Sequence, residues 1–122
     1  MFRFLSILLF AIGASATQND EAKCCCTTYD VSVCLSTVNQ KVDAEHDVIY
    51  QKALSASHRF GDKAVTYLVD AEKQWSTYKN AECEAEYALW DGGTGGPNAR
   101  AVCIIRLTRL RTDELRRRYH VR

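Results

Sequence analysis

The sequence predicts an all-α protein, an antiparallel three-helix bundle that is cross-linked by disulfides and preceded by a cleaved signal peptide. Three observations support this fold class. Apolar residues recur at steps of three and four in three long segments, as on the buried face of a helix. The chain of 122 residues has one Pro and six Gly, so little interrupts long helices. Six Cys follow an export signal, a combination that predicts disulfides.

Residues 1–16 have the features of a signal peptide. Arg3 supplies a positive start, an apolar run of about nine residues follows, and small residues lead to Ala16, after which we expect cleavage. The run is too short to cross a bilayer, which needs about 20 residues. We therefore expect an exported protein, periplasmic or extracellular, without a membrane span. Its mature chain would comprise a polar Cys-containing segment, 17–27, and a helical domain, 28–122.

The first helix is expected over residues 28–57 and the second from Asp62 to about residue 89. In the first, apolar residues recur at helical spacing: Val31, Leu35, Val38, Val42 and Ile49. In the second, the expected stripe contains one polar residue, Glu82, among Ala64, Leu68, Ala71, Trp75, Tyr78, Ala85 and Leu89. Steps of alternating four and three suit packing in a left-handed bundle.

A glycine-rich segment, 92–96, separates the second helix from a third that is expected over residues 97–119. The stripe of the third helix consists of Ala101, Ile105, Thr108, Thr112, Leu115 and Tyr119. Because of their stripe positions, we expect Trp75, Tyr78 and Leu115 to lie in the core. Glu82 also occupies a stripe position, so if buried it needs a charged partner, for which Arg111 and Arg106 are the candidates.

The spacing of two Cys around the glycine-rich turn predicts the disulfide Cys83–Cys103, because they lie at similar heights on adjacent helices, within reach of a bond. We expect Cys34 to bond one residue of the triplet Cys24, Cys25 and Cys26. For the two left over, a vicinal disulfide, a bond to another chain and free thiols all remain open. Three consecutive Cys fit metal coordination poorly, so we expect neither a metal nor another cofactor.

The charge of the mature chain is divided between two regions. Residues 17–96 hold 13 acidic and 7 basic residues, a net charge of −6, whereas residues 97–122 hold 8 Arg against Asp113 and Glu114, a net charge of +6. Antiparallel packing would place the acidic helices beside the basic one, so mutual neutralisation is the favoured interpretation. Nucleic-acid binders usually carry an overall basic excess, so we expect no nucleic-acid partner.

The sequence contains no motif of a nucleophile, a dinucleotide site or a phosphate-binding loop. Its abundant carboxylates are compatible with glycoside hydrolysis, but that reaction needs a cleft that a slim bundle has little room for. We therefore expect a protein that is not an enzyme.

Two stretches form distinctive motifs: Ala71-Glu72-Lys73-Gln74-Trp75 followed by Tyr78-Lys79-Asn80-Ala81-Glu82-Cys83, and Gly92-Gly93-Thr94 followed by Cys103-x₃-Leu107-Thr108-x₂-Arg111-x₃-Leu115. They resemble the lysozyme inhibitor LprI-like family, in its N-terminal domain. The central signature of that family is roughly A-Q-R-x-W-x-x-[FY]-R-D-x-E-C, followed by a double-Gly turn and C-x₃-L-T-x₂-R-x₃-L. The sequence departs from this signature at Lys79 and Asn80, where the family has Arg and Asp. It also departs in an earlier stretch, D-x-x-L-N-x-x-Y in the family, where His46 and Asp47 replace Leu and Asn. The matching residues are Trp75, Tyr78, Glu82, Cys83, Gly92, Gly93, Cys103, Thr108, Arg111 and Leu115.

The resemblance implies a periplasmic or cell-surface protein that binds a lysozyme and blocks its muramidase action. Lysozymes are commonly cationic, so acids near the glycine-rich turn are candidates for partner binding: Glu84, Glu86 and Asp91. The turn itself, 92–96, is a candidate for insertion into a cleft. The alternative function is a non-catalytic envelope module for protein interaction or stress response, and weak glycan hydrolysis ranks third.

Overall fold

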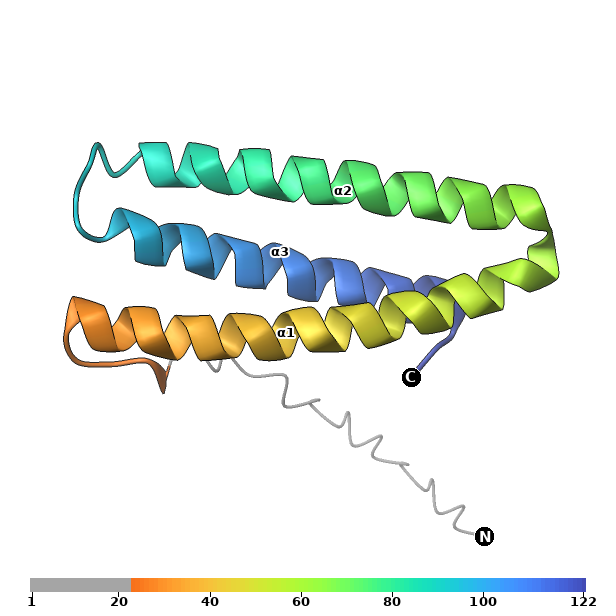
Figure 1. Ribbon diagram of the computed structural model, residues 1–122, viewed down its shortest axis with the longest axis horizontal. Helices are drawn as coiled ribbons and strands as arrows, with labels where there is room; N and C mark the ends of the chain where they lie inside the picture. Colours follow the sequence, from red (N-terminus) through yellow and green to blue (C-terminus); the bar gives the residue numbers. More distant parts are fainter. Residues whose placement is uncertain (1–22) are drawn as a thin grey trace, which may run out of the picture.

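The computed structural model describes residues 23–122, and the predicted signal peptide lies outside them. The described chain forms three long helices: α1 (Thr28–Ser57), α2 (Asp62–Ala88) and α3 (Gly96–Tyr119). A short 3-10 helix, η2 (His58–Phe60), connects α1 with α2. Figure 1 shows the helices running alternately in opposite directions, so the predicted antiparallel three-helix bundle is confirmed. None of the described helices has an apolar stretch long enough to cross a membrane.

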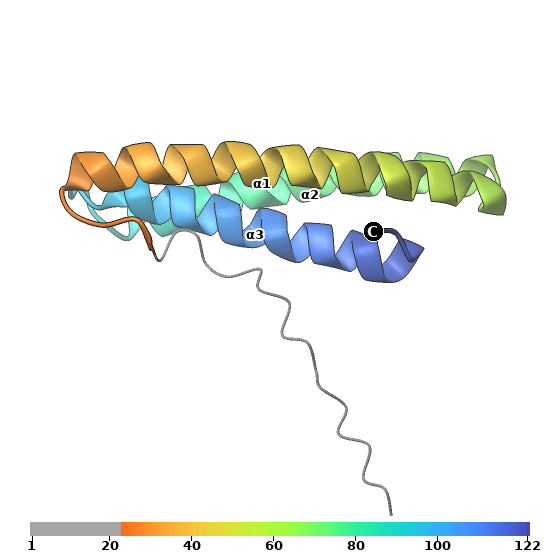
Figure 2. The same cartoon turned by 90° about the horizontal axis from the view of Figure 1, so that it is seen from below.

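Helix α3 is the central helix of the bundle. It packs extensively against both α1 and α2, whereas α1 and α2 contact each other much less. In Figure 1 α3 lies between α1 and α2, and in Figure 2, turned by 90°, α3 lies to one side of the other two helices. The predicted stripes of α1 and α3 are confirmed in the core, which contains Leu35, Val38, Val42 and Ile49 from α1 and Ile105, Thr108, Thr112 and Leu115 from α3.

The inner face of α2 differs from the predicted stripe. Leu68 is buried as expected, but Tyr78 is 54% exposed and Leu89 is 81% exposed, so the prediction that Tyr78 lies in the core was wrong. Glu82 is exposed as well, whereas its neighbour Cys83 is fully buried. From Glu72 onward the inner face of α2 is therefore offset by about one residue from the predicted stripe, and Cys83 faces α3 in the disulfide.

The described chain contains two disulfides, and both confirm the predicted pairing: Cys83 with Cys103, and Cys34 with one residue of the Cys triplet. Cys83 bonds Cys103 and joins α2 to α3, with the two Cα atoms 5.6 Å apart. Cys24 bonds Cys34, also at a Cα separation of 5.6 Å, and ties the N-terminal segment to α1. Cys26, which we also considered as a disulfide partner, is a free thiol in the structure, because Cys24 occupies the position opposite Cys34.

Ion pairs between helices account for part of the charge division in the sequence. Arg116 of α3 pairs with Glu45 of α1, and Arg100 of α3 pairs with Glu84 of α2. Arg111, a third Arg of α3, pairs with an acid of α2. The basic third helix is thus partly neutralised by the two acidic helices that it packs against, as the sequence predicted.

Candidate functional site

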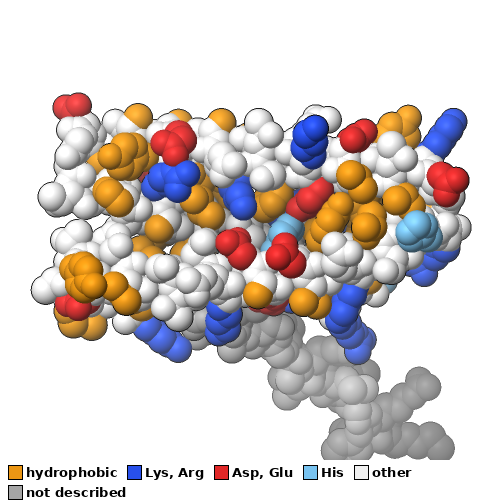
Figure 3. All heavy atoms as spheres, in the orientation of Figure 1, with side chains coloured by type: hydrophobic (Ala, Val, Ile, Leu, Met, Phe, Trp, Pro, Cys, Tyr) orange, Lys and Arg blue, Asp and Glu red, His pale blue; other side chains and the backbone are white. Residues whose placement is uncertain are grey.

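A cluster of polar side chains lies inside the bundle, about midway along it. His46 of α1 places Nε2 at 2.5 Å from Oε1 of Glu72, and Arg111 of α3 donates from Nε to the other oxygen of Glu72 at 3.0 Å. The indole of Trp75 lies beside the His46 ring, with 4.9 Å between the ring centroids. We call His46, Glu72, Trp75, Arg111 and Thr112 the polar cluster. Figure 3 shows acidic and histidine side chains gathered in the hollow between α1 and α2.

The partners of Glu72 decide its charge. Burial by itself would raise the pKa of the Glu72 carboxyl, but hydrogen bonds from His46 and Arg111 outweigh burial and lower that pKa. Burial would likewise lower the pKa of Arg111, yet its hydrogen bonds with Glu114 and Glu72 raise that pKa above the ordinary value. Both groups are therefore charged at neutral pH, and each compensates the desolvation of the other.

The hydrogen-bond pattern leaves His46 without a free nitrogen. The hydroxyl of Thr112 donates to the Thr108 carbonyl at 2.8 Å, so it accepts from Nδ1 of His46 at 2.9 Å. Nε2 faces the Glu72 carboxylate, which can only accept. Both ring nitrogens of His46 are therefore engaged by side chains of the other two helices. The cluster therefore joins all three helices through His46, Glu72 and Arg111.

A different region, the connection between α2 and α3, exposes apolar side chains at one end of the bundle. We call residues 89–95 the tip. Leu89 is 81% exposed and Trp90 is 48% exposed, although large apolar groups are normally buried. The backbone turns at Asp91 and Gly92, whose φ angles are 44° and 77°. A hydrogen bond from the Gly93 amide to the Trp90 carbonyl, at 2.7 Å, closes the turn.

Aromatic rings pack against glycines and order the tip. The Trp90 ring covers Gly95 so closely that a Cβ atom on Gly95 would lie 2.4 Å from the ring. The Tyr87 ring covers Gly96 in the same way, with 2.9 Å between a Cβ there and the ring. The disulfide Cys83–Cys103 joins the two helices behind the tip. The tip is therefore a fixed turn that displays Leu89 to solvent.

The packing on Gly95 gives a prediction. Gly95→Ala should lower the free energy of unfolding by about 1–2 kcal/mol, because the methyl group must displace the Trp90 ring. The backbone itself accepts alanine, since Gly95 has helical φ and ψ angles of −77° and −17°. Thermal melts of Gly95→Ala, Trp90→Ala and the double variant check this. If Gly95→Ala costs as much in the Trp90→Ala background as in the native chain, the ring contact is not the cause.

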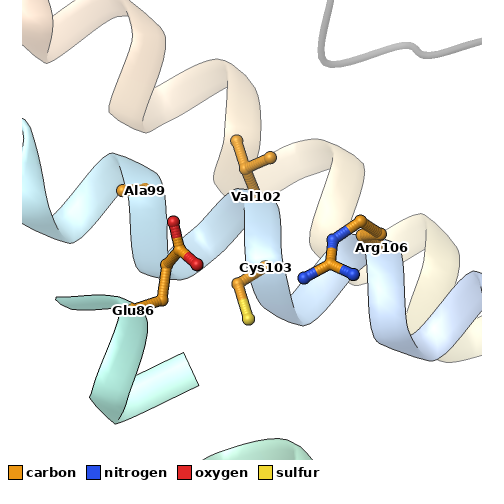
Figure 4. Close-up of a pocket in the computed structure, with 5 residues that line it drawn as sticks. All are labelled: Glu86, Ala99, Val102, Cys103 and Arg106. Atoms are coloured by element: carbon orange, nitrogen blue, oxygen red, sulfur yellow. The ribbon is translucent and has the colours of Figure 1, made fainter. Parts of the chain in front are cut away.

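The three acids predicted to bind a partner lie at or near the tip but in different settings. Glu84 already pairs with Arg100, and Asp91 is exposed in the turn. Glu86 lines a shallow cavity of about 370 Å³ between α2 and α3, together with Ala99, Val102, Cys103 and Arg106. In Figure 4 the Glu86 carboxylate and the Arg106 guanidinium lie on opposite sides of Cys103. Of these three acids, Asp91 therefore lies in the turn itself, whereas Glu84 and Glu86 lie on α2.

The sequence of this chain matches a known protein family. Residues 19–115 match the model of a family described as lysozyme inhibitor LprI. The chain belongs to the lysozyme inhibitor LprI family. This confirms the family that the sequence resembles, and the match includes all three helices except the last residues of α3.

A relative of this LprI family member is an uncharacterized protein of Rhizobium meliloti (strain 1021). The two are 27% identical over 124 aligned residues, which cover 92% of this chain and 89% of the relative. No solved structure matches the chain.

The structure divides the LprI-like signature residues into two groups. Thr108, Arg111 and Leu115 are buried, and Trp75 is half-buried, so packing accounts for them. Tyr78 and Glu82 are exposed on α2, and packing does not account for them. Gly92 adopts a positive φ angle that favours glycine, whereas Gly93 lies where a Cβ would contact the Trp90 carbonyl at 3.0 Å.

Sequence reasoning missed two members of the polar cluster, His46 and Glu72. It identified Arg111 as a candidate partner of a buried acid, but it assigned Glu82 to that role instead of Glu72. A signal was available, because His46 follows Val42 by four residues and precedes Ile49 by three, which places it on the buried stripe of α1. Glu72 differs from the predicted stripe residue Ala71 by a single position, which is the offset of the inner face of α2.

Proposed function

We propose that this protein binds a lysozyme and blocks its muramidase action, and that the tip is the contact surface. Membership of the lysozyme inhibitor LprI family is the observation that carries the proposal. The two disulfides support an exported protein, in the periplasm or outside the cell, where a lysozyme is encountered.

The shape of the tip supports its role as the contact surface. A muramidase is blocked when its substrate cleft is filled, and a narrow turn at the end of a rod can enter a cleft. Leu89 and Trp90 offer apolar surface that gains free energy on burial. Because ring–glycine packing and the disulfide already fix the turn, little conformational entropy is lost on binding.

Charge at the tip supports a cationic partner. Asp91 lies in the turn, and Glu86 lies behind it on α2. Lysozymes are commonly cationic, so these carboxylates favour the encounter and its orientation. The proposal therefore predicts that inhibition weakens as the salt concentration rises, since exposed charges more than about 8–10 Å apart are screened at physiological ionic strength.

A turnover assay tests the function. Lysozymes of more than one structural class are mixed with cell-wall suspension and increasing amounts of the oxidised protein, and clearing is followed. We expect clearing by at least one class to stop near a stoichiometric amount of protein. Unchanged turnover of every class at micromolar excess contradicts the proposal, and binding without loss of turnover favours the envelope-module alternative. A sample without lysozyme detects hydrolysis by the protein itself.

A further inference from the structure

Two adjacent cysteines at the start of the described chain remain outside the disulfides. Cys25 and Cys26 are exposed free thiols, and their sulfur atoms lie 2.7 Å apart. The hydrogen bond with Cys25 raises the pKa of the Cys26 thiol, which disfavours Cys26 as the first attacking group. Two thiols held side by side in solvent differ chemically from buried cysteines, because they are accessible to thiol reagents and to other disulfides.

The structure fixes the segment that carries these thiols on both sides. Cys24, the preceding residue, is bonded to Cys34 of α1. Thr27, the following residue, caps α1 in a capping box with Asp30. Between these anchors Cys26 has a φ angle of 97°, a conformation that L-residues rarely adopt. The anchors thus hold the two sulfurs together rather than letting the segment turn them apart.

A bond between these two sulfurs would differ from the two disulfides in the bundle. Consecutive Cα atoms are about 3.8 Å apart, below the roughly 4.4–6.8 Å that suits a disulfide. Both existing disulfides have Cα separations of 5.6 Å, within that range. Strained and exposed disulfides are the more easily reduced ones. A Cys25–Cys26 bond should therefore open under conditions that leave the other two intact.

We propose that Cys25 and Cys26 form a reversible dithiol–disulfide pair that exchanges with low-molecular-weight disulfides. In the first step the Cys25 thiolate attacks a disulfide RS–SR, forms a Cys25–SR bond and releases one thiolate. In the second step Cys26 loses its proton to solvent, attacks the Cys25 sulfur and releases the second thiolate. The protein dithiol is oxidised by two electrons, and the disulfide RS–SR is reduced to two thiols, so the exchange balances.

Mass spectrometry of the full exported chain tests this in glutathione buffers of stepped redox ratio. After acid quenching and alkylation, we expect the Cys25–Cys26 peptide to change from two alkyl groups to none, with a loss of two hydrogens, as oxidised glutathione increases. Cys24–Cys34 and Cys83–Cys103 should stay bonded throughout the range in which this change occurs. Lysozyme is absent from this measurement, so its outcome is independent of the proposed inhibition.

Two matched variants complete the test. Cys25→Ser and Cys26→Ser each leave a single thiol that cannot close, so each should accumulate the mixed disulfide with glutathione, which the native chain should not. The proposal is overturned if both native thiols remain alkylatable at every ratio or retain glutathione. It is also overturned if chains become linked to one another, or if Cys34 is released while Cys24 bonds a neighbour.

Discussion

Replacing Glu72 with Gln is expected to lower the free energy of unfolding by about 2–3 kcal/mol, among the largest effects of any single polar substitution in this chain. Glu72 accepts from both His46 and Arg111, and its side chain is 14% exposed. A neutral amide removes the negative charge that compensates the buried Arg111 guanidinium and weakens the hydrogen bond with His46. In a domain of about 100 residues, each kcal/mol shifts the melting temperature by roughly 4–8 °C.

Glu82→Gln is the matched control, because it makes the same chemical change ten positions further along α2 on an exposed side chain. We expect it to change the free energy of unfolding by less than about 0.5 kcal/mol. Denaturant unfolding of both variants separates the two sites. Equal effects of the two substitutions, or a larger effect at Glu82, would contradict the assignment of Glu72 as the buried partner of Arg111.

The lowered pKa of Glu72 fixes the sign of a pH effect. A carboxyl with a lower pKa in the folded state than in the unfolded state stabilises the fold at neutral pH. This contribution is lost as the pH falls from the usual carboxyl range toward the lowered pKa of the folded state. The native chain should therefore lose more stability than Glu72→Gln between about pH 5 and pH 3. Parallel acid unfolding curves for the two proteins would show that Glu72 makes no such contribution.

The sequence was sufficient to predict the helices, because their signals are local. Thr28–Ser57 and Asp62–Ala88 agree with the predicted segments to within a residue or so, and Gly96 begins α3 one residue before the predicted start. The disulfide Cys83–Cys103 could be predicted as well, since heights on two antiparallel helices follow from the turn between them. These inferences need only spacing along the chain and the rise of an α-helix.

The orientation of α2 about its own axis could not be predicted in the same way. The large apolar residues of the predicted stripe were Leu68, Trp75, Tyr78 and Leu89, and two of them, Tyr78 and Leu89, proved exposed. The true inner face includes Glu72, which a search for apolar residues passes over. Its burial depends on His46 and Arg111, which are 26 and 39 residues away along the chain. Such a set is recognised only when all three helices are placed together.

The candidate site was predicted in part. The glycine-rich segment marked a turn, and the acids around it were named, yet Leu89 was assigned to the core and Trp90 received no role. Packing of Trp90 on Gly95 is not visible in a sequence, because any glycine-rich stretch also fits a loose loop. In the structure the Trp90 ring packs on Gly95 and orders the turn, which exposes Leu89. The proposed function can therefore be tested by substitution at this surface.

Leu89→Asn is expected to raise the concentration of protein needed for half-inhibition of a sensitive lysozyme by about ten- to a hundred-fold. Burial of a leucine side chain contributes roughly 1.5–3 kcal/mol, and each 1.4 kcal/mol corresponds to a factor of ten in affinity. The substitution keeps the size of the side chain similar and removes its apolar surface. Because Leu89 is 81% exposed in the free protein, the melting temperature should hardly change.

Leu110→Asn provides the control for this prediction, because Leu110 is 57% exposed on α3 and lies about 20 Å along that helix from its start beside the tip. It makes the same chemical change on a surface that the proposal leaves free, so inhibition should persist. If both variants inhibit as well as the native chain while the native chain inhibits, the function stands and the tip is not the contact surface. The exposed signature residues Tyr78 and Glu82 on α2 would then be the next positions to substitute, since their exposure also lacks a structural reason.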